Sequence, residues 1–404
     1  RQLLQIVMNV AAYDATLVTP HCEQLCGLLS SNDKRVRELA AGALHYTNVD
    51  PSALTEYVSQ ASELVASTDE APEITGGLSL LEQAGRAEPQ AIMPALETVV
   101  DCLDEVNDHG YVLAAQIIAI IAEQNPEQIS SREVDAVVDI LFDAENDRAK
   151  LDIAKEIYQL SSVAPELLSD TVGRLIGYFR DVEEELPPLR RRMYLFLATA
   201  IVRVALHDVA NLAPYIEDLV GYRTEGTTVQ REEAARILGA TASEDSTLVR
   251  EYIDTLADGV SEGSHNVRKY TSDLLKNLAK ADAEVVVEHA GAIQTGLKCP
   301  KNITRLHAAR AVKYCVDEYP ETMQIFRDAV VARLDGDHVN TAKTLTTAFR
   351  LSMRGSRVKP DRRVIDILSQ EHDSQDLVRE RTQTLAAAAQ RYPQPPCSCH
   401  SVFC

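Results

Sequence analysis

The sequence predicts an all-α protein built from a repeated pair of helices, and three observations lead to that prediction. An arginine recurs every 37 residues, at Arg231, Arg268, Arg305 and, after Ala342 in the same series, at Arg379. Residues three, six and seven positions beyond each of these are mostly small or aliphatic, and those offsets trace one face of an α-helix. Only 17 Gly and 16 Pro occur among 404 residues, which is too few for a turn-rich β fold.

The helix that carries the arginine is clearest in three segments: "VRELAAGAL" (36–44), "HNVRKYTSDLL" (265–275) and "QDLVRERTQTLA" (375–386). Acidic turns precede these helices, where a negative charge favours the positive end of the helix dipole. They include Asp33, Asp69, Asp108, Asp147, Asp337 and Asp373.

Between the arginine helices lies another periodic helix, often opened by a proline. Proline is tolerated in the first turn because its missing N–H has no intrahelical partner there. The prolines that fall at comparable points are Pro51, Pro89, Pro126, Pro165 and Pro320.

The order of an acidic turn, Val-Arg, two small residues and Ala-Leu resembles the HEAT repeat, whose nearest relatives are armadillo repeats. The resemblance covers residues 1–391 as one continuous solenoid. It implies a right-handed α-α superhelix of about ten helix pairs plus a leading single helix, with the second helix of each pair on the concave side. The Pro-Pro step near residues 181–190 marks a candidate kink, and residues 392–404 form a Pro/Cys-rich tail that we expect to be disordered.

The first helix of the array has no preceding partner in the sequence. Arg1 lies 36 residues before Arg37, so "RQLLQIVMNVAAY" is interpreted as the second helix of a repeat. Its apolar face would then be uncovered. We expect either that the chain is a fragment or that a partner covers this end.

The net charge of −21 is concentrated in the first half of the chain. Residues 1–186 contain 33 acidic and 11 basic side chains, whereas residues 187–404 contain 28 and 29. One interpretation is an acidic, hydrated surface adapted to high salt. The other is a half that docks a basic partner and repels nucleic acid.

Several motifs that would indicate catalysis are absent from the sequence. It has no G-K-S/T phosphate loop, no G-x-G-x-x-G and no H-E-x-x-H. Deoxyhypusine hydroxylase, a HEAT-like enzyme, holds iron with paired His-Glu steps, but here the order is reversed at Glu288-His289 and Glu371-His372. We therefore predict no enzymatic activity and no cofactor.

The cysteines give two separate indications. Five internal cysteines are scattered on predicted helices and are typical of buried free thiols in a reducing, cytoplasmic protein: Cys22, Cys26, Cys102, Cys299 and Cys315. In the tail, Cys397, Cys399, His400 and Cys404 are weak candidates for a metal site, because their spacing matches no familiar zinc motif.

Two groups of basic residues are candidates for specific roles. The first is a structural ladder that joins adjacent repeats through turn acids and carbonyls, with a functional stripe as the alternative: Arg37, Arg231, Arg268, Arg305 and Arg379. The second is a basic stretch that is either a solvated loop or a contact for phosphate, nucleic acid or an acidic protein segment, of which an acidic protein partner is favoured because no aromatic residues are interleaved: Arg350, Arg354, Arg357, Lys359, Arg362 and Arg363.

Taken together, these features favour a non-catalytic, cytoplasmic scaffold or adaptor that binds one or more proteins along the groove of an α-solenoid. The alternative is a nucleic-acid-associated protein that uses the basic C-terminal half. A HEAT-like enzyme is a distant third. No stretch of the sequence is apolar and long enough to span a membrane.

Overall fold

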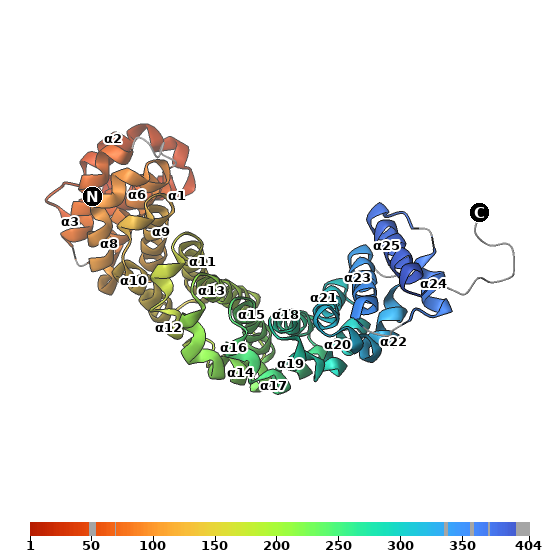
Figure 1. Cartoon of the computed structure of the whole chain (residues 1–404). Helices are drawn as coiled ribbons and strands as arrows, with labels where there is room; N and C mark the ends of the chain where they lie inside the picture. The colour runs from red at the N-terminus through yellow and green to blue at the C-terminus, as the bar shows by residue number, and fades with distance from the viewer. Residues whose placement is uncertain (48–53, 69, 335–337, 356–358, 371, 393–404) are drawn as a thin grey trace, which may run out of the picture. The chain divides into compact units, whose positions relative to one another are not determined.

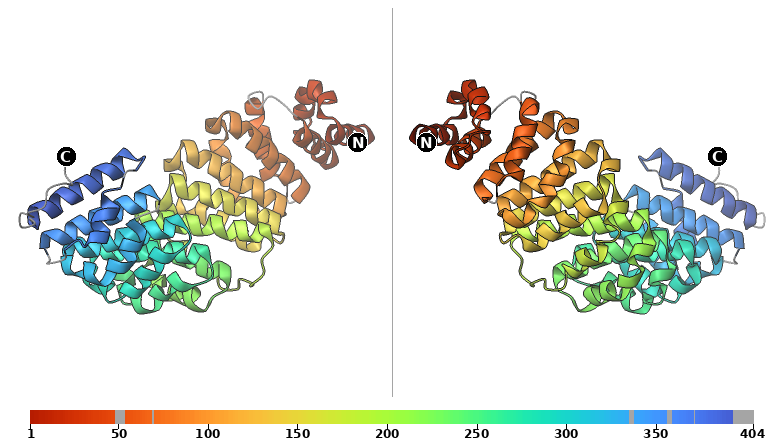
Figure 2. Two further views of the ribbon diagram at one scale, coloured as in Figure 1. Left: turned by 90° about the vertical axis from the view of Figure 1, so that its right-hand side faces the viewer. Right: turned by 90° about the vertical axis from the view of Figure 1, so that its left-hand side faces the viewer.

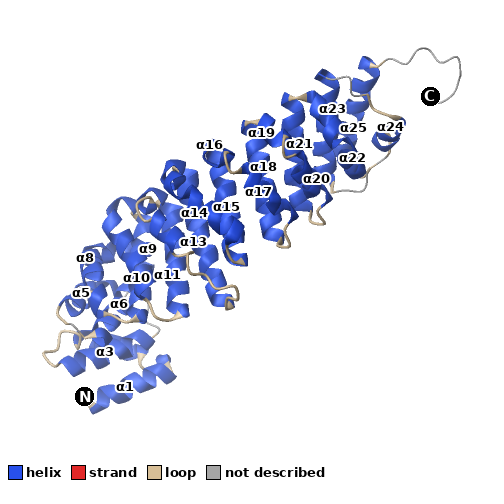
Figure 3. Cartoon of the chain, turned by 90° about the horizontal axis from the view of Figure 1, so that it is seen from below, coloured by secondary structure: helices blue, strands red, loops and turns tan. Residues whose placement is uncertain are grey.

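The computed structural model describes residues 1–47, 54–68, 70–334, 338–355, 359–370 and 372–392, and every regular element among them is a helix (Figure 3). The predicted all-α class is therefore confirmed. Asp69, Asp337, Pro51 and Arg357 lie outside the described residues, as does the tail with its Cys and His metal candidates.

The chain divides into two compact units, residues Arg1–Asn211 and Leu212–Cys404. The division falls inside the 3₁₀ segment η8 (Val209–Tyr215), beyond the stretch 181–190 where the sequence suggested a kink. The kink and the continuity of the solenoid over residues 1–391 remain predictions. Each unit is described separately below.

Long helices, here called B helices, form one layer of each unit, and each packs against the next B helix of the same unit (Figures 1 and 2). In unit 1 they are α1 (Gln2–Tyr13), α3 (Lys34–Tyr46), α6 (Ala71–Ala87), α9 (Asp108–Gln124), α11 (Asp147–Val163) and α13 (Pro188–His207). In unit 2 they are α15 (Thr228–Glu244), α18 (His265–Ala281), α21 (Asn302–Glu318), α23 (Val339–Gly355) and α25 (Gln375–Arg391).

Shorter helices, here called A helices, precede the B helices and are interrupted by 3₁₀ turns. In unit 1 they are α2 (Cys22–Gly27), α5 (Val58–Ala66), α7 (Pro89–Ile92) with α8 (Leu96–Asp101), α10 (Ser131–Asp143) and α12 (Val172–Gly177). In unit 2 they are α14 (Ile216–Glu225), α16 (Thr247–Arg250) with α17 (Ile253–Ala257), α19 (Ala283–Val287) with α20 (Ala290–Lys298), α22 (Met323–Leu334) and α24 (Arg362–Leu368). The predicted plan of one leading helix and about ten pairs is thus confirmed.

The spacing of the B helices in unit 2 is regular until the last one. Helices α15, α18, α21 and α23 begin at residues 228, 265, 302 and 339, 37 residues apart, whereas α25 begins at 375, which is 36 residues on. One residue corresponds to about 100° of rotation around a helix axis. The 37-residue series therefore reaches α25 on a different face.

Several of the B helices are capped by a side chain that bonds to first-turn N–H groups, as N-cap residues do. Asp33, Thr227 and Ser264 cap α3, α15 and α18. At α9 and α11 the caps are Asn107 and Asn146, and the predicted acidic turn residues after them are the first residues of the helices. The prolines at 89, 126, 165 and 320 open α7, η6 (Pro126–Gln128), η7 (Pro165–Leu168) and η10 (Pro320–Thr322), as predicted.

Helix α1 packs against α3, which confirms its interpretation as a B helix. On its other side Leu3 is 72% exposed and Ile6 57% exposed, and Leu4 and Val7 are half-buried. Leu4, Ile6 and Val7 border an apolar hollow of about 330 Å³ beside α2. That further chain or a partner covers this face remains a prediction.

Candidate binding surface on the B helices

Four of the five ladder arginines bond to the loop that precedes their own helix. Arg37 donates to the Ser31 carbonyl at 3.0 Å. The other three donors pair with carbonyls in the same way: Arg231 with Gly226 at 2.7 Å, Arg268 with Gly263 at 2.8 Å, and Arg305 with Cys299 at 2.8 Å. These bonds fix each loop against the first turns of its B helix.

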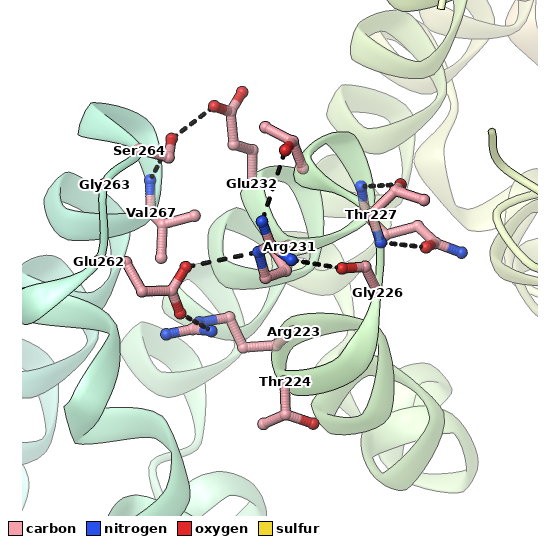
Figure 4. A network of polar contacts seen from close by, with 12 residues as sticks. Arg223, Thr224, Gly226, Thr227, Arg231, Glu232, Glu262, Gly263, Ser264 and Val267 are labelled. Atoms are coloured by element: carbon pink, nitrogen blue, oxygen red, sulfur yellow. Dashed lines mark hydrogen bonds and ion pairs between the residues drawn. The ribbon is translucent and has the colours of Figure 1, made fainter. Parts of the chain in front are cut away.

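Two of these arginines also reach the next repeat. Arg37 pairs with Glu73 of α6 at 3.1 Å, and the Glu73 side chain is almost fully buried. The Nε atom of Arg231 lies 3.5 Å from the carboxylate of Glu262, in the loop before α18 (Figure 4). Both the carbonyls and the acids that the sequence suggested as partners are therefore present.

An arginine that the sequence did not single out occupies the centre of this network. Arg223 of α14 is only 3% exposed and donates to the other carboxylate oxygen of Glu262 at 2.6 Å (Figure 4). Its guanidinium lies against Gly259, where a Cβ would stand 1.8 Å from Nη2. Arg223 lies more than 30 residues before Gly259 and Glu262 in the sequence, so its contacts with them become visible only in three dimensions.

The last member of the predicted ladder, Arg379, is exposed on α25. The buried arginine of that helix is Arg381, which is 3% exposed and donates to the carbonyls of Leu334 at 2.8 Å and Gln370 at 3.3 Å. Counted from the start of each helix, the position equivalent to Arg268 and Arg305 is Val378, because α25 begins 36 and not 37 residues after α23. Arg379 is one residue, or about 100° around the helix axis, beyond that position.

The predicted basic stretch 350–363 is distributed over two layers. Arg350, on α23, pairs with Glu380 at 2.9 Å and Gln383 at 3.0 Å, both on α25. Arg354 is exposed near the end of α23. Lys359 lies in the segment before α24, with its Nζ atom 5.5 Å from the ring centre of Tyr392.

Arg362 and Arg363 are exposed at the start of α24, in the A-helix layer. They line an open hollow of about 610 Å³ together with Val331 and Asp366. The described members of the stretch therefore do not form one surface. Whether any of them contacts a partner remains a prediction.

A different set of basic side chains is gathered on three adjacent B helices of unit 2. Positions 1, 5, 8 and 12 residues beyond the recurring position (268, 305, 342) lie on one side of α18, α21 and α23, and none of them is buried. We call these twelve residues the basic face, since eight are basic and two acidic: Lys269, Asp273, Lys276, Lys280, Leu306, Arg310, Lys313, Asp317, Lys343, Thr347, Arg350 and Arg354.

The middle of the basic face holds a cluster that joins two helices. Asp273 of α18 pairs with Lys276 on its own helix, and its carboxylate lies 3.2 Å from Nδ1 of His307 on α21. Burial lowers the pKa of His307, and the positive charges of Lys276 and Arg310 lower it further. The Asp273 carboxylate acts in the opposite direction and raises it. The imidazole is therefore held in its neutral form near pH 7.

The basic face contrasts with the charge of the rest of its unit. Unit 2 contains 27 acidic and 25 basic residues, a net charge of −2, whereas unit 1 contains 34 and 15, a net charge of −19. Helices α18, α21 and α23 together contain ten basic and three acidic residues. The remaining parts of unit 2 are thus acidic, with 24 acidic and 15 basic residues.

The B helices of unit 1 present a surface of another kind. A polar hollow of about 300 Å³ is lined by side chains of α6, α9 and α11, among them Arg86, Gln116, Glu123 and Lys155. Glu156 also lines it, and burial raises the pKa of this carboxyl while the neighbouring Lys155 ammonium opposes the change. Both signs of charge meet here.

The five cysteines in the described part of the chain are buried free thiols, as predicted, and burial raises the pKa of Cys26, Cys102 and Cys315 to about 12. Within the described ranges no three His, Cys, Asp or Glu side chains are grouped to hold a metal ion. None of the described helices is both long and apolar enough to cross a membrane.

Comparison with known proteins identifies the fold. No family model and no curated protein matches the chain. Among solved structures it is similar to a mutant of Kap121p, with a TM-score of 0.54 and 12% identity over 97% of this chain and 46% of that one. A structure of Kap95p with RanGDP gives a TM-score of 0.53 and 13% identity over 96% of this chain and 54% of that one.

Kap121p bound to RanGTP is similar at a TM-score of 0.50 and 12% identity, over 96% of this chain and 49% of that one. The chain thus spans about half the length of the solved structures it matches. At these identities the likeness concerns the fold alone. The fold is a HEAT-repeat α-solenoid, as the sequence predicted.

Proposed function

We propose that this chain is a non-catalytic scaffold that binds one or more proteins through the exposed side of its B helices. The observation that carries the proposal is the separation of charge in unit 2, where three adjacent B helices present basic side chains while the rest of the unit is acidic. Separation of this kind steers a partner of complementary charge to one face.

The proposal also draws on the fold and its relatives. An α-solenoid exposes a long layer of equivalent helices, which is the surface that such repeat proteins use for binding. Kap121p and Kap95p, which share the fold, have been solved with RanGTP and RanGDP respectively, both protein ligands of those chains. A cytoplasmic location is part of the proposal and rests on the free, buried cysteines.

The rival function is association with nucleic acid through the C-terminal half. The eight basic residues of the basic face are the observation in its favour. Against it stand Asp273 and Asp317 within the same face and a whole-chain charge of −21, which repels a polyanion at long range. A HEAT-like enzyme remains the third candidate, and no described group of side chains supports it.

Affinity capture from native lysate, with and without nuclease, tests the proposal. A scaffold predicts a protein that is retained in stoichiometric amount after nuclease treatment. Capture that disappears with nuclease, and falls steeply as salt is raised, would instead support the nucleic-acid function. Metal analysis of the purified protein tests the third candidate function, a HEAT-like enzyme.

A further inference from the structure

We infer that the basic face binds an extended acidic segment of a partner protein, laid across α18, α21 and α23. This inference rests on the proposed scaffold function and adds the chemical class of the partner and the residues that hold it. It concerns unit 2 alone and requires no contribution from unit 1.

The basic face contains a row of cations that repeats with the helices. Lys276, Lys313 and Arg350 occupy the same position on the three helices, 37 residues apart. The helices are packed neighbours, α18 against α21 and α21 against α23. Because packed helix axes lie about 8–10 Å apart, the row places one cation at about that interval.

An extended peptide in the polyproline II conformation matches this interval. It has three residues per turn and rises about 3.1 Å per residue, so every third side chain lies on the same side, about 9 Å from the last. A segment with an acidic residue at every third position would therefore place one carboxylate opposite each helix. Crossing the three helices needs about seven residues of such a segment.

Several cations of the face are available for such contacts. Within the described residues no ion pair joins Lys280, Arg310 or Lys313 to a carboxylate, and Arg310 and Lys280 are exposed. At the two ends of the row, Lys276 already pairs with Asp273, and Arg350 with Glu380. These ion pairs hold the two basic side chains in place.

The face fits a protein segment better than a nucleic acid strand. A strand carries one phosphate about every 3.4 Å of helix axis, roughly three times denser than the row of cations. Asp273 and Asp317 interrupt the face, and Leu306 and Thr347 occupy two more of its positions. Mixed charge with neutral gaps suits a partner whose acids are spaced and whose other side chains are uncharged or basic.

The test uses the full chain and a defined probe, a fluorescent peptide of Glu-Ser-Gly repeats about 20 residues long. Binding is followed by fluorescence anisotropy at about 50 and 200 mM NaCl. We expect binding that weakens with salt, as ion pairing at an exposed surface does. In the variant Lys280→Glu/Lys313→Glu we expect affinity at least about 10-fold lower, because two attractive contacts become repulsive.

The matched control is Lys298→Glu/Arg333→Glu, which makes the same change in net charge on α20 and α22 of the A-helix layer. Its affinity should stay within about twofold of the parent chain if the face, and not net charge, determines binding. Equal losses in the two variants would overturn the inference. So would a Ser-Gly-only peptide that binds as well as the acidic one, or a single-stranded oligonucleotide that binds more tightly than the acidic peptide and competes with it. Thermal unfolding of both variants establishes that they are folded.

Capture from lysate distinguishes failure of this inference from failure of the scaffold function. If the parent chain retains no protein after nuclease, the scaffold function itself fails. If it retains a protein that the Lys280→Glu/Lys313→Glu variant retains equally well, the scaffold function stands and the acidic-segment inference is wrong.

Discussion

Replacing Gly259 with alanine is the sharpest test of the buried network around Arg223. The added Cβ would stand 1.8 Å from Nη2 of Arg223 and 2.4 Å from the hydroxyl oxygen of Thr271. Ordinary contacts at these atoms begin near 3.4 Å, so the guanidinium must move by about 1.5 Å. Such a movement breaks the 2.6 Å bond to Glu262.

The magnitude follows from two costs. Forcing an extra carbon into a packed site costs about 1–3 kcal/mol. Leaving a buried arginine without its carboxylate costs about 3–5 kcal/mol, and the lower end applies because Glu262 is 30% exposed. Since the two costs overlap, we expect unit 2 to lose about 3–5 kcal/mol. For a unit of roughly 200 residues this corresponds to a fall in Tm of roughly 10 °C.

Differential scanning calorimetry of the full chain measures the change, and hydrogen exchange of α14 and α18 locates it. The matched control is Gly263→Ala, four residues on, where a Cβ would meet no atom within 4 Å. In the double variant Arg223→Ala/Gly259→Ala the second change should add much less than it does alone, because the two sites are in contact. A Gly259→Ala protein within about 1 kcal/mol of the parent would refute the reasoning.

Three further predictions follow from the same structure. Arg381→Met should lower the unfolding free energy by about 1–3 kcal/mol in urea denaturation, since it leaves the carbonyls of Leu334 and Gln370 without their donor. The control Arg379→Met, at an exposed position, should be near neutral. Equal effects of the two would contradict the assignment of Arg381 as the buried arginine of α25. In a variant whose tail cysteines are changed to serine, thiol reagents at pH 8 should label Cys26 only at the rate of unfolding, because burial raises its pKa to about 12. Rapid labelling of Cys26 in the native protein would disprove its burial. The lowered pKa of His307 means that the folded state favours the neutral imidazole. The stability that His307 contributes is therefore present above about pH 6.5 and is lost as the pH falls through the folded pKa. The Tm measured between pH 7.5 and 5.5 should fall less in His307→Gln than in the parent, and identical slopes would argue against this role.

The period of the repeat and the faces of its helices were predictable from the sequence, because both are local. An α-helix places residues three, four and seven apart on one side whatever packs against it, so Arg231, Arg268 and Arg305 are recognisable as equivalent positions. The prolines at the starts of the A helices are equally local signals. The series reaches Arg379 by extending a period of 37 across a step of 36 residues, so Arg379 is not at the equivalent position of its helix.

The basic face was within reach of the sequence but was not recognised there. Lys276, Lys313 and Arg350 recur at the same interval as the arginines. A basic run such as 350–363 is conspicuous because its charges are neighbours in sequence, yet the fold places Arg350 on α23 and Arg362 on α24. Adding the period to the pattern of charge would have pointed to the three helices.

The sequence by itself determined the class of fold, the number of helix pairs and the side of each helix that is buried, since helix geometry and hydrophobic spacing act within a few residues. Only the tertiary structure decided which charges meet. Arg223 and Glu262, and Asp273 and His307, are more than 30 residues apart in the chain and come together through the packing of successive repeats. Whether a charge is paired, buried or left available to a partner depends on that packing, because solvent exposure and the distance to an opposite charge set its free energy.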